Sequence, residues 1–391
     1  MTTASVPVSI DDPINTAILS VSEDQLTGFQ RDPFASIAER TDLDEDVVIA
    51  RLRAMLEAGV IRRVRQTLIT TNLADGALVA WRIPPRRVGD AFDRLTHDDP
   101  FTGHVVIRAA EPGTPGASYR LWTTVKVPQG FSLRRHTELL ADWVGASDYC
   151  TMPARAVFKL GVGHLRRRGL TPGARTRAAA TAMEPRVVPL SPLEWRVLPA
   201  LMREFRVQEM TPRPWTTRAS ELGMGVDAFA AIAEDFDSRG LVGRFATVLE
   251  HAKAVGPAPR VARCTALMAW AVPEGMEFQA GAEIGRHKIL THAYWRESSP
   301  ELGDLNLFGV AHAPDEDAAL AHKQAIDEHL RAAGIPTLRS GVFWSIRSAV
   351  RPSEILPSAY DQWCRSLDID PKTMRAGAQA TSADSGRRRK A

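Results

Sequence analysis

The fold prediction starts from two stretches, Lys288-Ile-Leu-Thr-His-Ala-Tyr-Trp-Arg296 and Asp304-Leu-Asn-Leu-Phe-Gly-Val-Ala-His312. In both, every second side chain shares one face if the backbone is extended. The loop between them contains Ser-Ser-Pro and Gly, which favour a connection between antiparallel strands. The face of an ordinary core strand is apolar, whereas this hairpin face is polar, so we expect it to line a pocket. Its polar side chains are His292, Tyr294, Arg296, Asn306 and His312.

Composition and charge indicate an ordinary globular chain. The sequence has 391 residues, of which 44% are hydrophobic and 24% are charged. A chain of this length can form two to four modules with their own cores. The net charge is only +3, from 49 basic and 46 acidic residues, which is too balanced to indicate nucleic acid as a partner. Part of the surplus lies in the basic tail at 387–390.

Three cysteines, Cys150, Cys264 and Cys364, lie far apart with no Cys-x-x-Cys motif. This spacing argues against an iron–sulfur or zinc cluster, and the sparse, odd number suits a reducing cytoplasm. The N-terminus carries acidic residues rather than an apolar run, so we expect no signal peptide. No stretch has the apolar length that crossing a membrane requires. We therefore expect a cytoplasmic protein without a membrane partner.

The first half of the chain predicts a winged helix-turn-helix followed by a larger α+β domain. Residues 1–20 are polar and are expected to be disordered. In residues 21–70, Pro33 can open a helix, Gly59 ends the second helix of the pair, and a short β wing follows. Residues 75–161 alternate as β-α-β-β-α-β, the ferredoxin-like order. The predicted strands are 77–83, 104–110, 119–127 and 149–160, and the predicted helices are 86–95 and 132–144.

The same order then recurs. Trp215 precedes Gly240 by 25 residues (240 − 215), as Phe34 precedes Gly59 (59 − 34). The strand Ala77-Leu-Val-Ala-Trp-Arg-Ile-Pro84 returns as Ala266-Leu-Met-Ala-Trp-Ala-Val-Pro273. This internal repeat predicts two tandem units, whose ferredoxin-like sheets we expect to pack face to face across a pseudo-twofold axis. The remaining boundaries are a linker at 162–188, a second winged helix-turn-helix at 189–252, a second ferredoxin-like domain at 260–350, and a C-terminal extension with a basic tail at 351–391.

These features resemble the siroheme decarboxylase branch of the Lrp/AsnC family, over about residues 25–350. The resemblance is carried by Thr211-Pro-Arg-Pro-Trp215, by Arg244-Phe-Ala-Thr-Val-Leu-Glu-His251 in the second wing and by the polar hairpin. Ala293 and Glu297 stand where that family usually has Cys and Pro, and 303–305 replaces a Trp-Pro-Tyr. These departures bear on the exact substrate more than on the fold.

The two halves differ at the positions that could carry chemistry. At the offset that aligns the repeats, Val106, Ala110 and Lys126 stand where the second half has His292, Arg296 and His312. The first half keeps basic side chains at even spacing. We expect one half to supply proton-carrying histidines and the other to supply fixed positive charge. These first-half cations are Arg108, Arg120 and Lys126.

The resemblance implies loss of two acetate carboxyl groups from siroheme as CO2, giving 12,18-didecarboxysiroheme for heme d1 or alternative heme biosynthesis. His292 and His312 would donate protons, because histidine titrates near neutrality, and Tyr294 would orient or relay. No added cofactor is required, since the iron arrives with siroheme, and His292 or His312 is the candidate iron ligand. The expected substrate-binding residues are Arg296, Asn306, Arg108, Arg120, Lys126 and His251.

Other interpretations remain open from the sequence. The histidines and Tyr294 could be structural strand residues, and the first-half cations a solvated face. The rival function is an Lrp/AsnC-type transcription regulator, responsive to heme in one version. However, Asp44, Asp227 and Glu234 lie on the candidate recognition helices, where phosphates would repel them, which argues against nucleic acid. An inactive heme-binding or chaperone protein is a third class. The expected protein partners are a second copy of the chain or related decarboxylase subunits.

Overall fold

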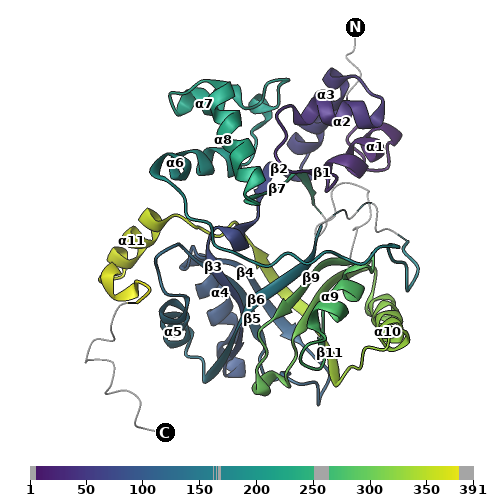
Figure 1. Cartoon of the computed structure of the whole chain (residues 1–391), viewed down its shortest axis with the longest axis vertical. Coiled ribbons are helices and arrows are strands. Elements are labelled where there is room, and N and C mark those ends of the chain that lie inside the picture. The colour runs from purple at the N-terminus through teal and green to yellow at the C-terminus, as the bar shows by residue number, and fades with distance from the viewer. Residues whose placement is uncertain (1–5, 162, 164, 166–168, 251–263, 378–391) are drawn as a thin grey trace.

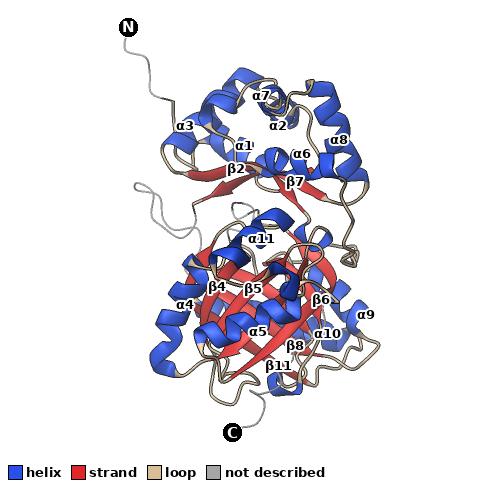
Figure 2. Ribbon diagram, turned by 90° about the vertical axis from the view of Figure 1, so that its left-hand side faces the viewer, coloured by secondary structure: helices blue, strands red, loops and turns tan. Residues whose placement is uncertain are grey.

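The structure is a computed structural model that describes residues 6–161, 163, 165, 169–250 and 264–377. It has two layers, a helical layer around a small sheet and a β-barrel beneath it with helices on its outer surface (Figures 1 and 2). The helical layer contains α1 Pro13–Ser22, α2 Pro33–Thr41, α3 Glu45–Glu57, α6 Pro192–Met202, α7 Thr216–Glu221 and α8 Val226–Ser238. Its sheet consists of β1 Leu26–Thr27, β2 Ile61–Leu68 and β7 Val242–Leu249.

The barrel layer holds eight strands and the helices that cover them. The strands are β3 Asp75–Arg82, β4 Thr102–Ala109, β5 Leu121–Val127, β6 Asp148–Leu160, β8 Cys264–Ala271, β9 Leu290–Arg296, β10 Leu307–Ala313 and β11 Arg339–Val350. The covering helices are α4 Val88–His97, α5 Leu133–Val144, α9 Glu277–Gly285 and α10 Glu316–Ala332, and α11 Pro357–Ser366 follows the barrel. Short 3-10 helices are η1 Thr70–Asn72, η2 Pro85–Arg87, η4 Val207–Glu209, η5 Pro300–Leu302 and η6 Pro371–Met374.

Helix α1 corrects part of the expectation that residues 1–20 are disordered, because residues 13–20 lie in it. Helix α1 begins at Pro13, and the Asp12 carboxylate accepts hydrogen bonds from the backbone N–H groups of Ile14 and Asn15. Proline in the first turn and an acidic N-cap are strong helix-start signals. Ile18 and Leu19 are fully buried against the other helices. The prediction failed because the apolar residues of 13–22, which include Ile18 and Leu19, alternate with Asn, Thr and Ser side chains that make the segment look polar.

The two wings form one sheet. β2 and β7 pair along their length in antiparallel register, and β1 pairs with the other edge of β7. A single apolar core lies between this sheet and the helices of both winged units. Phe34 from α2 packs edge-on against Phe245 of β7, with ring centroids 5.8 Å apart. The two winged units therefore share one core.

The barrel corrects the expectation of two sheets packed face to face. Its ring runs β10-β8-β11-β4-β5-β3-β6-β9 and closes between β9 and β10. Each half supplies four consecutive strands, and the halves join edge to edge where β11 pairs with β4 and β6 pairs with β9. Edge pairing satisfies the N–H and C=O groups that separate sheets would leave exposed. Both halves run strand, helix, strand, strand, helix, strand, as predicted.

Two segments tie the halves together. The segment predicted as a linker runs along the barrel, where Val157 and Met183 exchange backbone hydrogen bonds of 2.9 and 2.8 Å. The C-terminal extension returns to the first half, and Tyr360 of α11 lies against Phe131 with ring centroids 4.2 Å apart. The hydroxyl of Tyr360 also lies 2.9 Å from Nδ1 of the buried His136. The linker thus follows the first half and pairs with it, whereas the C-terminal extension follows the second half but packs on the first.

Truncating Phe34 should loosen both winged units together. Phe34→Ala removes a fully buried ring from the shared core, at a cost of about 3–5 kcal/mol of unfolding free energy. Hydrogen exchange followed by mass spectrometry should show faster exchange in α3 and in α8. Leu193→Ala, on the exposed side of α6, is the matched control. Faster exchange in α3 alone would contradict a shared core.

Candidate functional site

A cavity of about 340 Å³ lies where β2 of the wing sheet meets the rim of the barrel. We call it the central cavity. Its wall combines strands of the wing sheet, of the first half and of the second half, so neither half forms it alone. The polar side chains that line it are Arg65, Gln66, Thr67, Thr70, Thr71, His104, Thr124, Lys126, His292, Tyr294, Arg296, Arg351 and Ser353.

His292 and Tyr294 lie two residues apart on β9, as the alternation predicted, and both line the cavity. Their rings stack with centroids 6.0 Å apart and planes 12° apart. The Thr291 hydroxyl donates to the carbonyl of Val310 at 3.2 Å, so it accepts from Nδ1–H of His292 at 2.9 Å. This hydrogen bond fixes the orientation of the ring.

Arg296 continues the same strand face. Its guanidinium carbon lies 4.5 Å from the centre of the Tyr294 ring, and Nη1 donates to the carbonyl of Met152 at 3.1 Å. The side chain is buried, and its Nε has no hydrogen-bond partner in the part of the chain that the structure describes. Burial lowers the pKa of Arg296. Burial raises the pKa of Tyr294, and the positive charges of Arg296 and Arg244 oppose that rise.

Lys126 brings a first-half cation into the same cavity from β5. Burial lowers its pKa to about 7, and repulsion by Arg296 acts in the same direction, whereas Asp75 opposes the shift. Burial raises the pKa of Asp75, so this carboxylate is itself costly to keep charged. A ligand with negative charge would offset the cost of burying the lysine and arginine charges together.

His104 and Arg65 are among the cavity residues that sequence reasoning missed. His104 precedes Val106 and Arg108 at even spacing on β4, and this alternation was the signal that could have found it. Burial lowers the pKa of His104 to about 4, and the charge of Arg108 adds to the effect. Arg65 belongs to the wing sheet, and no local pattern indicates that a wing strand covers the mouth of a barrel.

Several predicted site residues do not line this cavity. Asn306 accepts from the backbone N–H of Val272 and donates to its carbonyl, both at 3.1 Å, so it fastens the end of β8. Arg120 is exposed and immediately precedes the first residue of β5. His312 lies with Nδ1 3.1 Å from the Thr265 hydroxyl. His251 falls outside the described residues.

Arg108 is buried but also lies away from the cavity lining. It donates to the Phe343 carbonyl at 3.3 Å and to the Ser345 hydroxyl at 3.0 Å, and burial lowers its pKa to about 9. These contacts join β4 to β11, the strand from the other half. Of the nine side chains predicted for the site, the structure brings together His292, Tyr294, Arg296 and Lys126.

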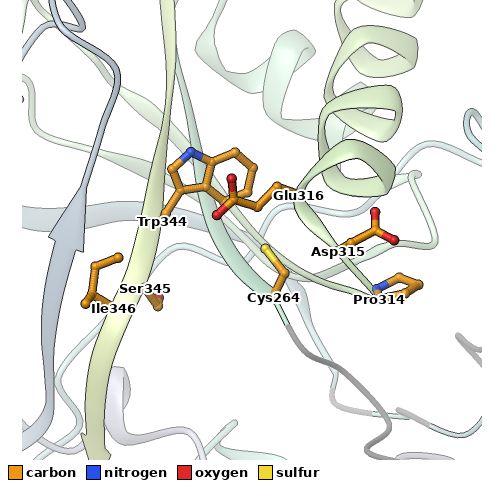
Figure 3. A pocket seen from close by; sticks show the side chains of 7 residues that line it. All are labelled: Cys264, Pro314, Asp315, Glu316, Trp344, Ser345 and Ile346. Atoms are coloured by element: carbon orange, nitrogen blue, oxygen red, sulfur yellow. The ribbon is translucent and has the colours of Figure 1, made fainter.

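A second hollow of about 390 Å³ lies at the start of α10 (Figure 3). It is lined by Cys264, Pro314, Asp315, Glu316, Trp344, Ser345 and Ile346. Its charged groups are carboxylates, and burial raises the pKa of the Cys264 thiol to about 11, with Glu316 and Asp315 adding to the shift. A thiol with this pKa is a poor nucleophile near neutrality. The central cavity is therefore the better candidate for an anionic ligand.

Within the described residues, no helix has both the length and the apolar character needed to cross a bilayer.

Comparison with family models identifies an AsnC-like ligand binding domain at residues 73–159 and 262–342. A second model, the siroheme decarboxylase NirDL-like HTH domain, matches residues 29–62. The matches cover barrel strands from both halves and the first helix pair.

Individual relatives agree with these models. The siroheme decarboxylase NirDL subunit of Paracoccus pantotrophus is 24% identical over 321 residues, covering 80% of this chain and 89% of the relative. The siroheme decarboxylase of Hydrogenobacter thermophilus is 23% identical over 73% of this chain and 80% of its own length. The crystal structure of the siroheme decarboxylase NirDL in co-complex with an iron-uroporphyrin III analogue superposes with a TM-score of 0.62 at 19% identity, covering 90% of this chain and 99% of that one.

Replacing Lys126 by Met should stabilise the ligand-free protein. The pKa of Lys126 is about 7 in the folded chain, against an ordinary 10.5. Between these two pH values the unfolded chain holds the lysine proton and the folded chain does not, so the stability of the unaltered protein rises with pH. The gain from Lys126→Met should be full at pH 7 and should disappear as the pH approaches 10.5. Urea unfolding at the two pH values measures it, with Lys372→Met on the exposed surface as control. A loss of stability at pH 7 would contradict the assigned cost of burial.

Proposed function

Because this chain belongs to the siroheme decarboxylase branch of the Lrp/AsnC family, we propose that it converts siroheme to 12,18-didecarboxysiroheme by removing two acetate carboxyl groups as CO2. The observation that carries the proposal is the composition of the central cavity. A histidine held by a hydrogen bond, His292, faces the same space as cations from both halves, the buried Arg296 and the half-buried Lys126. The class of enzyme is a carboxy-lyase.

The cavity cations suit the substrate. Siroheme carries many carboxylates, and arginine binds a carboxylate through two parallel hydrogen bonds while lysine adds a point charge. A complete tetrapyrrole is larger than a 340 Å³ cavity, which is near the low end of the range of about 300–1,000 Å³ for ligand sites. The edge of the ring that carries the reacting acetates would therefore enter the cavity, and the rest of the ring would lie in its opening.

The reaction needs one proton for each CO2 released. The bond between the acetate methylene carbon and its carboxyl carbon breaks, and the electron pair stays on the methylene carbon, where the conjugated macrocycle spreads the charge. His292 protonates that carbon from Nε2, which leaves a methyl group on the ring. Solvent then returns the proton to the imidazole before the second acetate reacts. Tyr294, stacked on His292, keeps the ring in place, and the iron arrives with the substrate.

The remaining predicted residues keep weaker support. His312, Asn306, Arg108 and Arg120 contact protein groups or solvent rather than the described cavity lining. Their substrate roles, and iron ligation by either histidine, stay predictions. Within this proposal the histidine that lines the cavity, His292, is the one assigned to proton transfer.

The rival regulator role finds little support in the helical layer. The wings that would lie along a DNA duplex pair with each other as β2 and β7. On the second recognition helix, α8, Asp227 and Glu234 bind Arg31 from the first winged unit at 2.9 and 3.0 Å. Phosphates would have to displace these contacts against the repulsion of two carboxylates.

We further propose that the chain is two tandem units, each a winged helix-turn-helix with a ferredoxin-like domain, that have fused so that one chain holds a complete site. The recurring element order and the edge-paired barrel support this interpretation. Association with a second copy or with related decarboxylase subunits would then be an addition rather than a requirement. A cytoplasmic location suits the three free cysteines.

Anaerobic incubation of the purified protein with siroheme, followed by mass spectrometry of the tetrapyrrole, tests the function directly. Loss of two CO2 units is the expected result. Unchanged siroheme, together with tight binding of a specific DNA sequence in a gel-shift assay, would favour the regulator instead.

Replacing His292 by Ala should reduce turnover by about a hundredfold to ten-thousandfold, the usual contribution of a positioned proton donor. Binding of siroheme, followed by its absorbance, should be largely retained, because Arg296 and Lys126 remain. His97→Ala, on the exposed face of α4, is the control and should match the unaltered protein. Full activity in the His292 variant would remove its proposed role.

A further inference from the structure

We propose that the sheet formed by the two wings (the wing sheet, β1, β7 and β2) forms one wall of the substrate site. Arg65 on this sheet binds a substrate carboxylate that the reaction leaves in place. This inference rests on the proposed decarboxylase function and deepens it. It gives the winged layer a direct part in substrate recognition. The argument uses the orientation of β2, the register of β2 with β7 and the charges around Arg65.

The two faces of β2 serve different layers. Val64 is fully buried in the apolar core shared with the helices. Arg65 and Thr67 lie on the opposite face by strand alternation, and both line the central cavity. The same face of the sheet therefore looks toward His292, Tyr294 and Arg296 at the barrel rim.

The strand register places Arg65 near the middle of the β2–β7 ladder. Arg65 follows Gly59 by six residues (65 − 59), and Ala246 follows the equivalent Gly240 by six (246 − 240). These two equivalent residues pair directly with each other across β2 and β7. A local twofold relation between the wings thus passes through this pair. One wing supplies a guanidinium there, and the other supplies only a methyl group.

The surroundings of Arg65 carry surplus positive charge. The nearby acid, Glu204, is already bound by Arg63 at 2.9 Å. Nε of Arg65 is buried without a hydrogen-bond partner among the described residues. Burial lowers the pKa of Arg65, and the charges of Arg63, Arg244 and Arg62 lower it further, while Glu204 opposes them. A half-buried guanidinium in this setting is stabilised by an anion that approaches from the cavity.

The carboxylate that Arg65 holds should be one that survives the reaction. A guanidinium bound to a reacting acetate would stabilise its negative charge in the ground state, and that stabilisation would be lost as CO2 leaves. Binding a spectator carboxylate carries no such penalty, because the contact is the same before and after the reaction. Arg65 would then set the orientation of the ring while His292 serves the reacting edge.

The test compares Arg65→Met and Arg65→Lys with Arg63→Met in the full-length chain. Arg63→Met removes one positive charge from the same strand, two residues away, at a side chain outside the described cavity lining. The affinities for siroheme and for didecarboxysiroheme are measured by absorbance titration, together with kcat/KM for siroheme. Circular dichroism confirms that each variant is folded.

Arg65→Met should weaken substrate and product binding by the same factor, about ten- to a hundredfold, and Arg65→Lys should restore part of the loss. Arg63→Met should change both affinities by much less. Equal affinities in the Arg65→Met variant and the unaltered protein would overturn the proposal, and so would a loss confined to the substrate, which would place Arg65 at a reacting acetate. Failure of the unaltered protein to decarboxylate siroheme would instead count against the underlying function.

Discussion

Antiparallel hydrogen bonding between the edge strands of the two halves is the constraint on which the rest of the molecule depends. Pairing of β11 with β4 and of β6 with β9 closes the ring of eight strands. An eight-stranded barrel has an interior that side chains nearly fill. The interior is apolar around Trp122 and Phe308, and the polar cavity lies at the rim under the wing sheet. Closure therefore both removes the free edges and brings side chains from both halves to one place.

The cavity is costly for the ligand-free protein. The half-buried Lys126 and the buried Arg296 lie close enough for the arginine charge to lower the pKa of the lysine, and Arg65 lines the same cavity from the wing sheet. Without a ligand, the desolvation of such groups destabilises the fold. A bound anion offsets that free-energy cost. The surplus of cations over acids in the cavity points to a polyanionic guest, as the carboxylates of siroheme provide. The second hollow, with Asp315 and Glu316, has the opposite sign.

The sequence predicted the elements well and the site in part. Alternation placed His292, Tyr294 and Arg296 on one strand face, and the structure places all three in the cavity. The same alternation placed His312 on the partner strand, yet its ring contacts Thr265 outside the cavity lining. Strand alternation tells which side chains share a face but not how far along the barrel each lies. That position depends on the stagger of the strands, which closure determines.

The sequence by itself determined the order of elements, the repeated spacing and the different ionisable side chains at matching positions, because these follow from spacing within each segment. Only the tertiary structure decided that the halves join edge to edge and that a wing strand covers the barrel. It also decided that Arg65 and His104 belong to the same cavity as Lys126. These features arise from hydrogen bonds and burial between segments far apart in the chain. No local pattern of residues encodes which distant strand will satisfy a given edge.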